Sequence, residues 1–554
     1  MTFPHKIFLT LIISGCFFNS NAAKITPDTT KRLPLAAPNN ISSQFNDYMA
    51  YLKEGITSIR QDSVDKGIHL INVAMQHATA VKPITRIFDY RMLEVYQLLA
   101  IIDTSKLSLP EKQLGRAFLK SAFSAKDAQP EQSLNDYIKK SPNTVFTQRI
   151  KMLTLSYTDR RRMEDALDEL LKASPKLITA NILKAEMLCD DEEYSGAINY
   201  CNNVIAVWPQ YAHAFHVRAK SYSHNSQYKE AIDDYNIAIK LYPQFILFDY
   251  DRAITLYDME NYKDAISGYL KVYAVSPDFR WVNYYLARCY KNVSMADSAF
   301  YYIDKHIKLN PDDGDGYNTK GDIYYDQDNY QKAVEFHNRA INLDNNNAGY
   351  YEDRGDDYYY LDQLDDAIKD YEKTLSIDKK RAYTNDRIGD AYYKKKEYEK
   401  GIVYHQTAIK IDPNYKYAYV GIYLCYSKLG KLKQSIEACQ KAIAIDSTYS
   451  SALGNLGWAY YQDGKYDAAI EYSYKAIKYN EKATYAMFNI ALATLRKGEY
   501  EKAKELYQQF INLCNEKKFT ISDGAVEDLK DLIKQHIAEN EATFIIKSMF
   551  KASL

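Results

Sequence analysis

One 34-residue period decides the fold, and residues 348–381 are a representative copy of it: AGYYEDRGDDYYYLDQLDDAIKDYEKTLSIDKKR. In this copy Gly355 lies three residues before Tyr358, and Ala367 lies four residues before Tyr371. Small residues on two helices let the backbones approach closely, and aromatic rings fill the space around that contact. The pattern therefore predicts an antiparallel pair of helices.

The same period runs through most of the chain. A proline recurs once in each period, at Pro175, Pro209, Pro243, Pro277 and Pro311. A column of small residues keeps the same register, at Ala197, Ala231, Ala265, Ala299, Ala333, Ala367, Gly401, Ser435, Ala469 and Ala503. Proline ends the second helix of one pair before the next pair begins. A register that is unbroken to about residue 517 predicts one continuous stack of helix pairs.

These columns resemble the tetratricopeptide repeat family. The family's pattern of aromatic, Leu-Gly, Tyr, Ala, aromatic and Pro appears here as Tyr351, Arg354-Gly355, Tyr358, Ala367, Tyr371 and, in the Pro column, Lys379. The resemblance covers residues 178–517 well and 144–177 as a weaker copy, so that 144–517 hold about eleven repeats. It implies an all-α fold, a right-handed superhelical solenoid of antiparallel helix hairpins whose first helices line a concave groove.

The ends of the chain differ from the repeats. Residues 1–22 have the features of an export signal, with an apolar run near the N-terminus. That run is too short to span a bilayer. The sequence allows cleavage after Ala22 or lipid attachment at Cys16, the last residue of a lipobox-like stretch, 13–16. We expect a flexible tether at 23–45, a helical N-terminal region of degenerate repeats or a cap at 46–143, and at 518–554 a capping helix, from Ser522-Asp523 to about Asn540, with a tail.

Composition and motifs argue against several classes of function. Lys and Arg number 71 against 72 Asp and Glu, so the chain lacks the basic footprint that nucleic-acid binding needs. No phosphate loop, metalloprotease motif or serine elbow is recognisable, and we expect neither catalysis nor a cofactor. His213 and His216 lie three residues apart, but no further ligand completes a recognisable set, so no metal site is predicted.

Six cysteines follow the predicted signal. Cys189 with Cys201, and Cys425 with Cys439, each fall on the two helices of one predicted hairpin, where a disulfide is geometrically conceivable. Cys201 and Cys439 occupy a column that core aromatics otherwise fill. This position favours free cysteines that pack as small hydrophobic residues.

A ladder of acidic residues and tyrosines follows the first helices of the middle repeats. Its members share one helix face. They are Asp322, Tyr325, Glu352, Asp356, Tyr359, Asp386, Asp390 and Tyr393, continued two repeats later by Trp458 and Tyr461. Nearer the N-terminus the matching positions become neutral to basic, as at Lys220 and Arg288. We expect a groove that holds an extended peptide or a helix, with basic groups over the carboxylates and tyrosine rings as flat contacts. The alternative is a solvated face copied by duplication.

The predicted function is that of a scaffold or adaptor of the cell envelope, periplasmic or lipid-anchored, which binds a protein or peptide. A secreted factor that binds host or neighbouring-cell proteins is one alternative. The other is a sensor on which a sugar or an amine stacks against Tyr359 and Tyr393. Contact with a membrane is expected only through a lipid anchor at Cys16.

Overall fold

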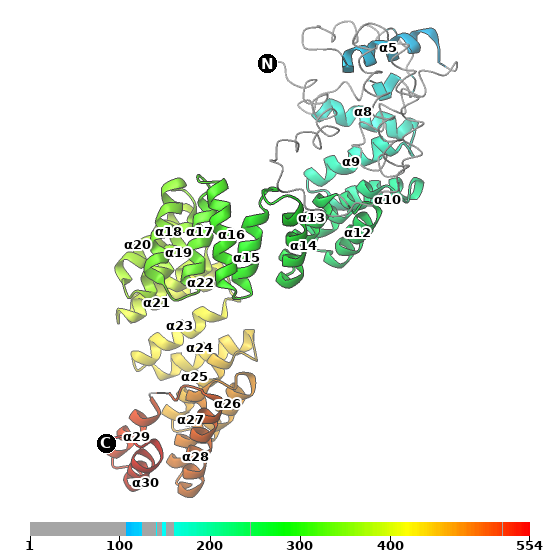
Figure 1. The fold of residues 1–554 in the computed structure, drawn as a ribbon. Helices are drawn as coiled ribbons and strands as arrows, with labels where there is room; N and C mark the ends of the chain where they lie inside the picture. Colours follow the sequence, from blue (N-terminus) through cyan, green and yellow to red (C-terminus); the bar gives the residue numbers. More distant parts are fainter. Residues whose placement is uncertain are drawn as a thin grey trace, which may run out of the picture. The chain divides into compact units, whose positions relative to one another are not determined.

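The computed structural model describes residues 107–123, 140, 144, 147–150, 160–243, 245–522 and 524–553, and in these residues every regular element is a helix (Figure 1). They fall into two compact units, Met1–Val293 and Ser294–Leu554. The predicted export signal, Cys16, the tether and most of residues 46–143 lie outside the described residues. Among the described helices, none is long and apolar enough to span a bilayer.

The N-terminal unit repeats a helix pair with the predicted period. The first helix of a pair begins at Ile178, Ala212 or Ile246, so the period is confirmed here. The described helices are α5 (Leu109–Phe123), α8 (Arg160–Ala173), α9 (Ile178–Asp190), α10 (Tyr194–Val207), α11 (Ala212–His224), α12 (Tyr228–Leu241), α13 (Ile246–Asp258), α14 (Tyr262–Val275) and α15 (Val282–Asn292).

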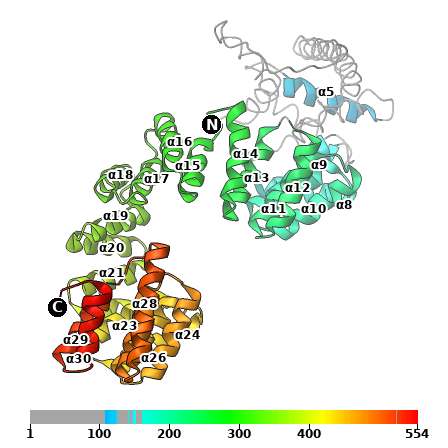
Figure 2. The ribbon, with the colours of Figure 1, turned by 60° about the horizontal axis from the view of Figure 1, so that its bottom comes forward.

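The C-terminal unit continues the same period, with odd-numbered first helices and even-numbered second helices from α17 to α28. Its repeat helices are α16 (Ala296–Leu309), α17 (Gly314–Tyr325), α18 (Tyr330–Leu343), α19 (Ala348–Tyr360), α20 (Leu364–Ile377), α21 (Ala382–Lys394), α22 (Tyr398–Ile411), α23 (Lys416–Lys428), α24 (Leu432–Ile445), α25 (Ser450–Gln462), α26 (Tyr466–Tyr479), α27 (Thr484–Arg496) and α28 (Tyr500–Lys517). In Figures 1 and 2 helices α17 to α22 follow one another as neighbouring pairs.

The helices of a pair meet where the small residues and the aromatic rings were predicted to lie. A Cβ atom at Gly355 would lie 2.7 Å from the ring of Tyr371, and both Ala367 and Tyr371 are fully buried. The close approach of α19 to α20 therefore requires glycine at this position, and the ring supplies the apolar area that holds the pair together. The sequence columns are the contacts between helices, which confirms the predicted all-α solenoid of helix hairpins.

Successive first helices also contact one another. In the C-terminal unit α17 contacts α19, α19 contacts α21, α21 contacts α23, α23 contacts α25 and α25 contacts α27. Second helices contact the first helices before and after them. The first helices α17, α19, α21, α23, α25 and α27 thus form one continuous surface, called the first-helix face below.

The C-terminal end differs from its prediction. Instead of one helix to about Asn540, the chain forms α29 (Gly524–Lys534), α30 (Glu539–Phe544) and the π-helix η3 (Ile545–Phe550). His536 and Ala538 have φ angles of 57° and 45°, and these left-handed residues break the helix. Helix α29 packs against α27, and η3 packs against α28.

The six cysteines of the described residues are free and buried, as the favoured interpretation predicted. They are Cys189, Cys201, Cys289, Cys425, Cys439 and Cys514. Burial raises the pKa of the Cys425 thiol to about 12, which keeps it protonated and unreactive.

Candidate functional site

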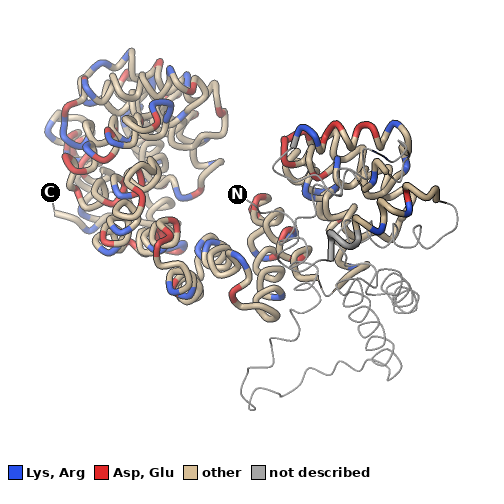
Figure 3. Tube along the Cα trace, turned by 90° about the horizontal axis from the view of Figure 1, so that it is seen from above, with Lys and Arg blue, Asp and Glu red and all other residues tan. Residues whose placement is uncertain are grey.

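The predicted acidic ladder lies on three first helices of the C-terminal unit, with Asp322 on α17, Glu352 and Asp356 on α19, and Asp386 and Asp390 on α21. Acidic and basic residues are interspersed along the helices (Figure 3). The carboxylates of the ladder are accordingly not a row of solvated charges, because several of them have partners within the protein.

Asp356 lies at the centre of a buried network. Its Oδ1 atom accepts hydrogen bonds from Arg387 Nε at 2.8 Å and from the Tyr371 hydroxyl at 2.5 Å. Its Oδ2 atom accepts a hydrogen bond from the Tyr383 hydroxyl. Asp356 is therefore not a solvated carboxylate, because it is buried and a guanidinium from the next repeat pairs with it.

Glu352 has a similar arrangement. Arg381 Nη1 donates to Glu352 Oε2 at 2.7 Å, and the hydroxyl of Thr384 donates to Oε1. Burial raises the pKa of Glu352, and the contacts with Thr384 and Arg381 oppose that rise. Three of the five predicted carboxylates thus have an arginine partner on or next to α21, since Arg387 Nη1 also lies 3.6 Å from Asp390 Oδ2.

Asp386 and Asp390 lie on either side of a buried histidine from the second helix α22. His405 Nδ1 is 2.6 Å from Asp386 Oδ1, and His405 Nε2 is 4.0 Å from Asp390 Oδ1. The imidazole lies between Gly389 and Gly421, where an added Cβ atom would come within 2.6 Å and 2.2 Å of it. Burial and the neighbouring charge of Asp386 raise the pKa of Asp390 to about 6.

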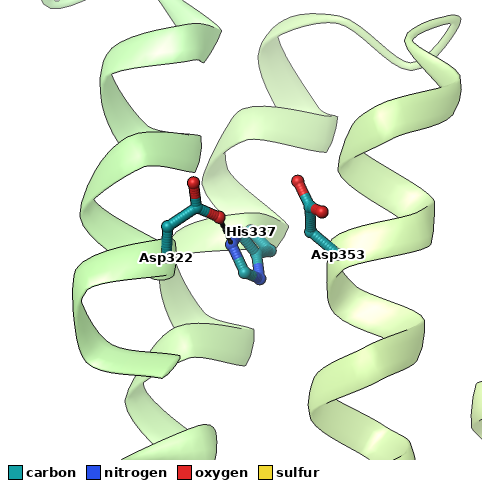
Figure 4. Close-up of side chains that lie close together, drawn as sticks. All are labelled: Asp322, His337 and Asp353. Atoms are coloured by element: carbon teal, nitrogen blue, oxygen red, sulfur yellow. Dashed lines mark ion pairs between the residues drawn. The ribbon is translucent and has the colours of Figure 1, made fainter. Parts of the chain in front are cut away.

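Asp322 belongs to a second cluster of aspartates around a buried histidine, His337 of α18 (Figure 4). His337 Nδ1 is 2.6 Å from Asp357 Oδ2, and His337 Nε2 is 3.5 Å from Asp322 Oδ1. Asp353 of α19 lies beside them, and its Oδ2 atom accepts a hydrogen bond from Asn318 Nδ2 at 2.8 Å. We call Asp322, His337, Asp353 and Asp357 the aspartate–histidine cluster.

The charges in this cluster shift one another's protonation. Burial opposes the protonation of His337, but Asp322 and Asp357 together raise its pKa to about 10. Burial raises the pKa of Asp357 to about 6. Burial, together with the charge of Asp322, raises the pKa of Asp353 to about 7. Three carboxylates thus lie around one imidazole at this point of the first-helix face.

The ladder tyrosines already contact side chains of the protein. The guanidinium of Arg387 and the ammonium of Lys394 each lie 4.2 Å from the ring centroid of Tyr359. Tyr325 contacts the rings of Tyr330 and Tyr360, and Tyr393 contacts that of Tyr398. Two cations of the protein therefore lie against the ring of Tyr359, on which a ligand's amine was predicted to stack.

Trp458 and Tyr461 do not continue an open strip. Their rings stack at a centroid distance of 5.0 Å and pack against the C-terminal hydrophobic core, which includes Leu529 of α29. Burial raises the pKa of Tyr461 to about 12. The segment after residue 517 therefore covers the predicted C-terminal end of the groove.

In the N-terminal unit, the predicted basic positions are partly compensated. His213 Nε2 lies 2.7 Å from Glu186, and His216 Nε2 lies 2.6 Å from Asp251. The guanidinium of Arg288 lies 5.2 Å from the ring centroid of Tyr257. Lys220 is exposed. His213 and His216, which were also expected to contribute to this neutral to basic region, thus each lie beside a carboxylate.

The sequence interpretation overlooked a group of tyrosines at the start of α21, α23 and α25. Tyr383 and Tyr417 hold the same position in consecutive repeats and expose 41% and 50% of their surface, although they are large and partly apolar. Tyr415 and Tyr449 lie beside Tyr417, at centroid distances of 5.3 and 5.7 Å. We call Tyr383, Tyr415, Tyr417 and Tyr449 the tyrosine patch. The sequence pattern that could have predicted this patch is the recurrence of tyrosine after one repeat period, from Tyr383 to Tyr417 and from Tyr415 to Tyr449.

Family models of the tetratricopeptide repeat match the C-terminal unit. One model matches residues 314–347, 382–415 and 419–449, and two others match residues 438–471 and 455–514. These matches fall on the helix pair α17–α18 and on helices α21 to α28. No curated protein matches the chain in sequence.

Solved structures of other repeat proteins are similar to parts of the chain. The crystal structure of MamA is 28% identical, with 29% of this chain and 95% of that chain covered and a TM-score of 0.27. YrrB, described as a TPR protein with an unusual peptide-binding site, is 21% identical, with 33% and 95% covered and a TM-score of 0.28. The APC/C hetero-tetramer Cut9–Hcn1 is 12% identical, with 80% and 99% covered and a TM-score of 0.40.

Proposed function

Since the chain is a tetratricopeptide repeat protein, we propose that it is a scaffold that binds a protein or peptide through the first-helix face of its C-terminal unit, at the tyrosine patch. This repeat fold is typically that of a non-catalytic interaction scaffold, and we expect no turnover by the purified chain. The proposal concerns where the partner binds and by what chemistry.

The observation that carries the proposal is the state of Tyr383. The residue is 41% exposed, whereas its hydroxyl donates a hydrogen bond to the buried carboxylate of Asp356. A ring that is fixed at its polar end and exposed along its body loses little conformational freedom when a partner packs against it. Tyrosines of this kind are frequent among the residues that dominate binding energy.

The neighbouring residues extend this surface. Tyr417 exposes half of its surface one repeat later, and Tyr449 meets it edge to face. Lys416 lies 4.9 Å from the ring centroid of Tyr449, and an ion pair of 2.6 Å with Asp446 holds its ammonium there. The patch therefore offers apolar ring area with a few fixed polar groups, which suits a peptide segment.

The chemistry of the partner follows from what the protein has already neutralised. Arginines pair with Glu352 and Asp356, and Asp386 Oδ1 lies 2.6 Å from His405 Nδ1, so these carboxylates already have partners within the protein. We infer that aliphatic or aromatic side chains of an extended segment or a helix contact the tyrosine patch. A small amine or sugar on Tyr359 is disfavoured, because Arg387 and Lys394 already contact that ring.

We further propose that the scaffold acts after export, as an adaptor of the cell envelope. The support is the sequence of residues 1–22, with its short apolar run and the lipobox-like stretch that ends at Cys16. Mass spectrometry of the N-terminus of the natural protein tests this proposal. A lipid-modified Cys16 or a new terminus at Ala23 is expected, whereas an intact Met1 on the mature protein would contradict export.

The binding proposal is tested by photocrosslinking in native cells. A benzophenone amino acid is placed at Tyr417, in the tyrosine patch, or at Tyr474, which is 49% exposed on the second helix α26. Residue type and exposure are matched, so only the face differs. We expect a discrete crosslinked protein from position 417 and none from position 474.

Substitution provides the second measurement. We expect Tyr417→Ala to reduce recovery of the crosslinked partner at least about tenfold, a loss typical of a dominant interface residue. Tyr474→Ala should leave recovery unchanged. Equal recovery with the two variants would show that the first-helix face is not the binding surface.

A further inference from the structure

Three side chains from three consecutive helices converge in the aspartate–histidine cluster. Asp322 of α17, His337 of α18 and Asp353 of α19 each offer one potential ligand atom, and these atoms all lie within 4.8 Å of one another (Figure 4). The cluster combines two carboxylates with one imidazole. These are ligand types that bind divalent transition-metal ions.

His337 is held as a metal-binding histidine usually is. Its side chain is 1% exposed, and its Nδ1 atom donates to Asp357 Oδ2 at 2.6 Å. This contact leaves Nε2 directed toward Asp322, at 3.5 Å, which is longer than an ordinary hydrogen bond. Nε2 is buried and has no hydrogen-bond partner in the protein. A carboxylate behind the far nitrogen is the usual way in which proteins orient a ligating imidazole.

The spacing of the atoms fits an ion between them. Two ligands that each lie about 2.1 Å from a tetrahedral metal ion are about 3.4 Å apart. The distance from His337 Nε2 to Asp322 Oδ1 is 3.5 Å, so these two ligands need almost no movement. Asp353 offers a third ligand atom within 4.8 Å of these two, and its Oδ2 atom accepts a hydrogen bond from Asn318 Nδ2 at 2.8 Å. Asn318 thus has the position of an orienting partner for the second carboxylate.

The next repeat contains an internal comparison. The residues that correspond to Asp322, His337 and Asp353 one period later are Asp356, Tyr371 and Arg387. There Arg387 Nε lies 2.8 Å from the Asp356 carboxylate. At the matching place the second repeat carries its own cation, whereas the first repeat carries a second anion. One period further on, the residues are Asp390, His405 and Gly421, and Asp386 supplies the second carboxylate of a comparable group. There Asp386 itself holds His405 Nδ1, at 2.6 Å, whereas in the first repeat Asp357 holds His337 Nδ1 and is not one of the three candidate ligands.

We propose that Asp322, His337 and Asp353 bind one divalent first-row transition-metal ion, of the Zn²⁺ or Mn²⁺ type, which links helices α17, α18 and α19. Asp357 and Asn318 orient the ligands, and water completes the coordination. The imidazole favours these ions over Ca²⁺ and Mg²⁺, which prefer oxygen ligands. The ion then has, beside Asp322, the place that Arg387 has beside Asp356 one repeat later.

The competing account is that the cluster holds only a proton. In that case His337 is an imidazolium between Asp322 and Asp357, and no metal ion enters. Isothermal titration calorimetry separates the two accounts. The untagged full chain is stripped with EDTA, dialysed and titrated at neutral pH with ZnCl₂ or MnCl₂, and with MgCl₂ and CaCl₂ for comparison. We expect one equivalent of Zn²⁺ or Mn²⁺ per chain, and weaker binding of Mg²⁺ and Ca²⁺.

The variants identify the ligands. Asp353→Asn keeps the shape of the side chain and leaves the His337–Asp357 pair in place, so the fold should persist, which circular dichroism checks. We expect it to weaken binding at least about tenfold. Asp390→Asn removes a carboxylate of the comparable group of Asp386, Asp390 and His405, so it tests whether the ion lies there instead, and we expect it to bind as the wild type does.

Co²⁺ provides a spectroscopic readout, because a nitrogen and oxygen ligand set gives visible absorption bands that Asp353→Asn should remove. The proposal is overturned if the wild-type chain binds no transition metal at millimolar concentration. It is also overturned if Asp353→Asn binds as tightly as the wild type, or if Asp390→Asn, and not Asp353→Asn, loses binding.

Discussion

Two neighbouring repeats place opposite charges at one structural position. In the repeat of α17 and α18, Asp322 and His337 face Asp353, and in the repeat of α19 and α20, Asp356 and Tyr371 face Arg387. The backbone scaffold is the same, and the three positions of one set correspond one for one to those of the other. One site holds its own cation, and the other concentrates carboxylates around an imidazole.

The comparison shows how a solenoid can vary its chemistry without altering its fold. The small and aromatic columns hold the helix pairs, so residues next to them can change from repeat to repeat. Each repeat contacts mainly its neighbours. A charge that changes at one position is therefore paired by a side chain of the next repeat and does not affect the rest of the chain. The variants below test this division, beginning with the largest expected effect.

Removing the internal cation of the second repeat should have the largest effect. Arg387→Met leaves Asp356 buried with only tyrosine partners, and we expect a loss of about 3 to 5 kcal/mol, as when one member of a buried ion pair is removed. Hydrogen exchange of α19 to α22 and the urea midpoint of the full chain measure it. The double variant Arg387→Met with Asp356→Asn should recover most of the loss.

Lys394 provides the matched control for Arg387. Both cations lie 4.2 Å from the ring centroid of Tyr359, but Lys394 is exposed and its ion pair with Asp362 is 3.4 Å long. Lys394→Met should therefore cost less than about 1 kcal/mol. Similar losses in the two variants would mean that the ring contact, and not the Asp356 carboxylate, is what Arg387 stabilises.

The second variant converts the first repeat into the second. Asp353→Arg places a guanidinium where Arg387 lies one repeat later. In the wild type, a metal ion at about 100 times its dissociation constant should raise the free energy of unfolding by about 2.7 kcal/mol, and EDTA should remove that gain. We expect Asp353→Arg to show no response to Zn²⁺ or EDTA in urea unfolding. A response of wild-type size would place the ion elsewhere.

The fold could be predicted from the sequence because its contacts repeat. The glycine and aromatic columns, such as Gly355 and Tyr371, are the positions at which the helices of a pair touch, so the pattern reported the packing directly. The C-terminal end could not be predicted in the same way. His536 and Ala538 break the helix with left-handed backbone angles, and neither position has the glycine or proline that normally signals a break.

The site was predicted only in part, for a related reason. The acidic ladder was visible because Asp322, Asp356 and Asp390 repeat, but their partners do not. Arginine stands at the position of Arg387 in that repeat and not in its neighbours, where the residues are Asp353 and Gly421. His337 and His405 replace the core aromatic of the second helix in two separate repeats. Histidine in an aromatic column was a usable signal, since a buried imidazole needs polar neighbours. For Lys220 and Arg288, the sequence had no comparable pattern that would indicate which side chains lie next to them.

In the third repeat, Gly421 stands at the position of Asp353 and Arg387. A substitution there tests why that repeat has glycine. A Cβ atom at Gly421 would lie 2.2 Å from the His405 ring, whose other side is held by Asp386 and Gly389. Gly421→Ala should therefore destabilise α21 to α24 by about 1 to 3 kcal/mol.

The control for this change is Gly349→Ala in α19. The nearest atom to its Cβ would be the side-chain oxygen of Asn347, at 3.3 Å, so we expect a change within about 0.5 kcal/mol. Urea midpoints compare the two. Equal effects would show that His405 can move away, and that glycine is not required beside it.

The smallest expected effect is the pH dependence of Asp390 in the third repeat, where no arginine corresponds to Arg387. The folded pKa is about 6, above the ordinary value of 3.8, so the folded state holds the proton more tightly than the unfolded state does. The free energy of unfolding that depends on Asp390 should thus fall as pH rises from about 4 to 6, and stay low above that. Because the side chain is 31% exposed, Asp390→Asn should raise stability at pH 7 by only about 1 kcal/mol and leave it unchanged at pH 4. A larger gain at pH 4 than at pH 7 would mean that the charged form of Asp390 is stabilised, with Arg387, at 3.6 Å, serving both aspartates.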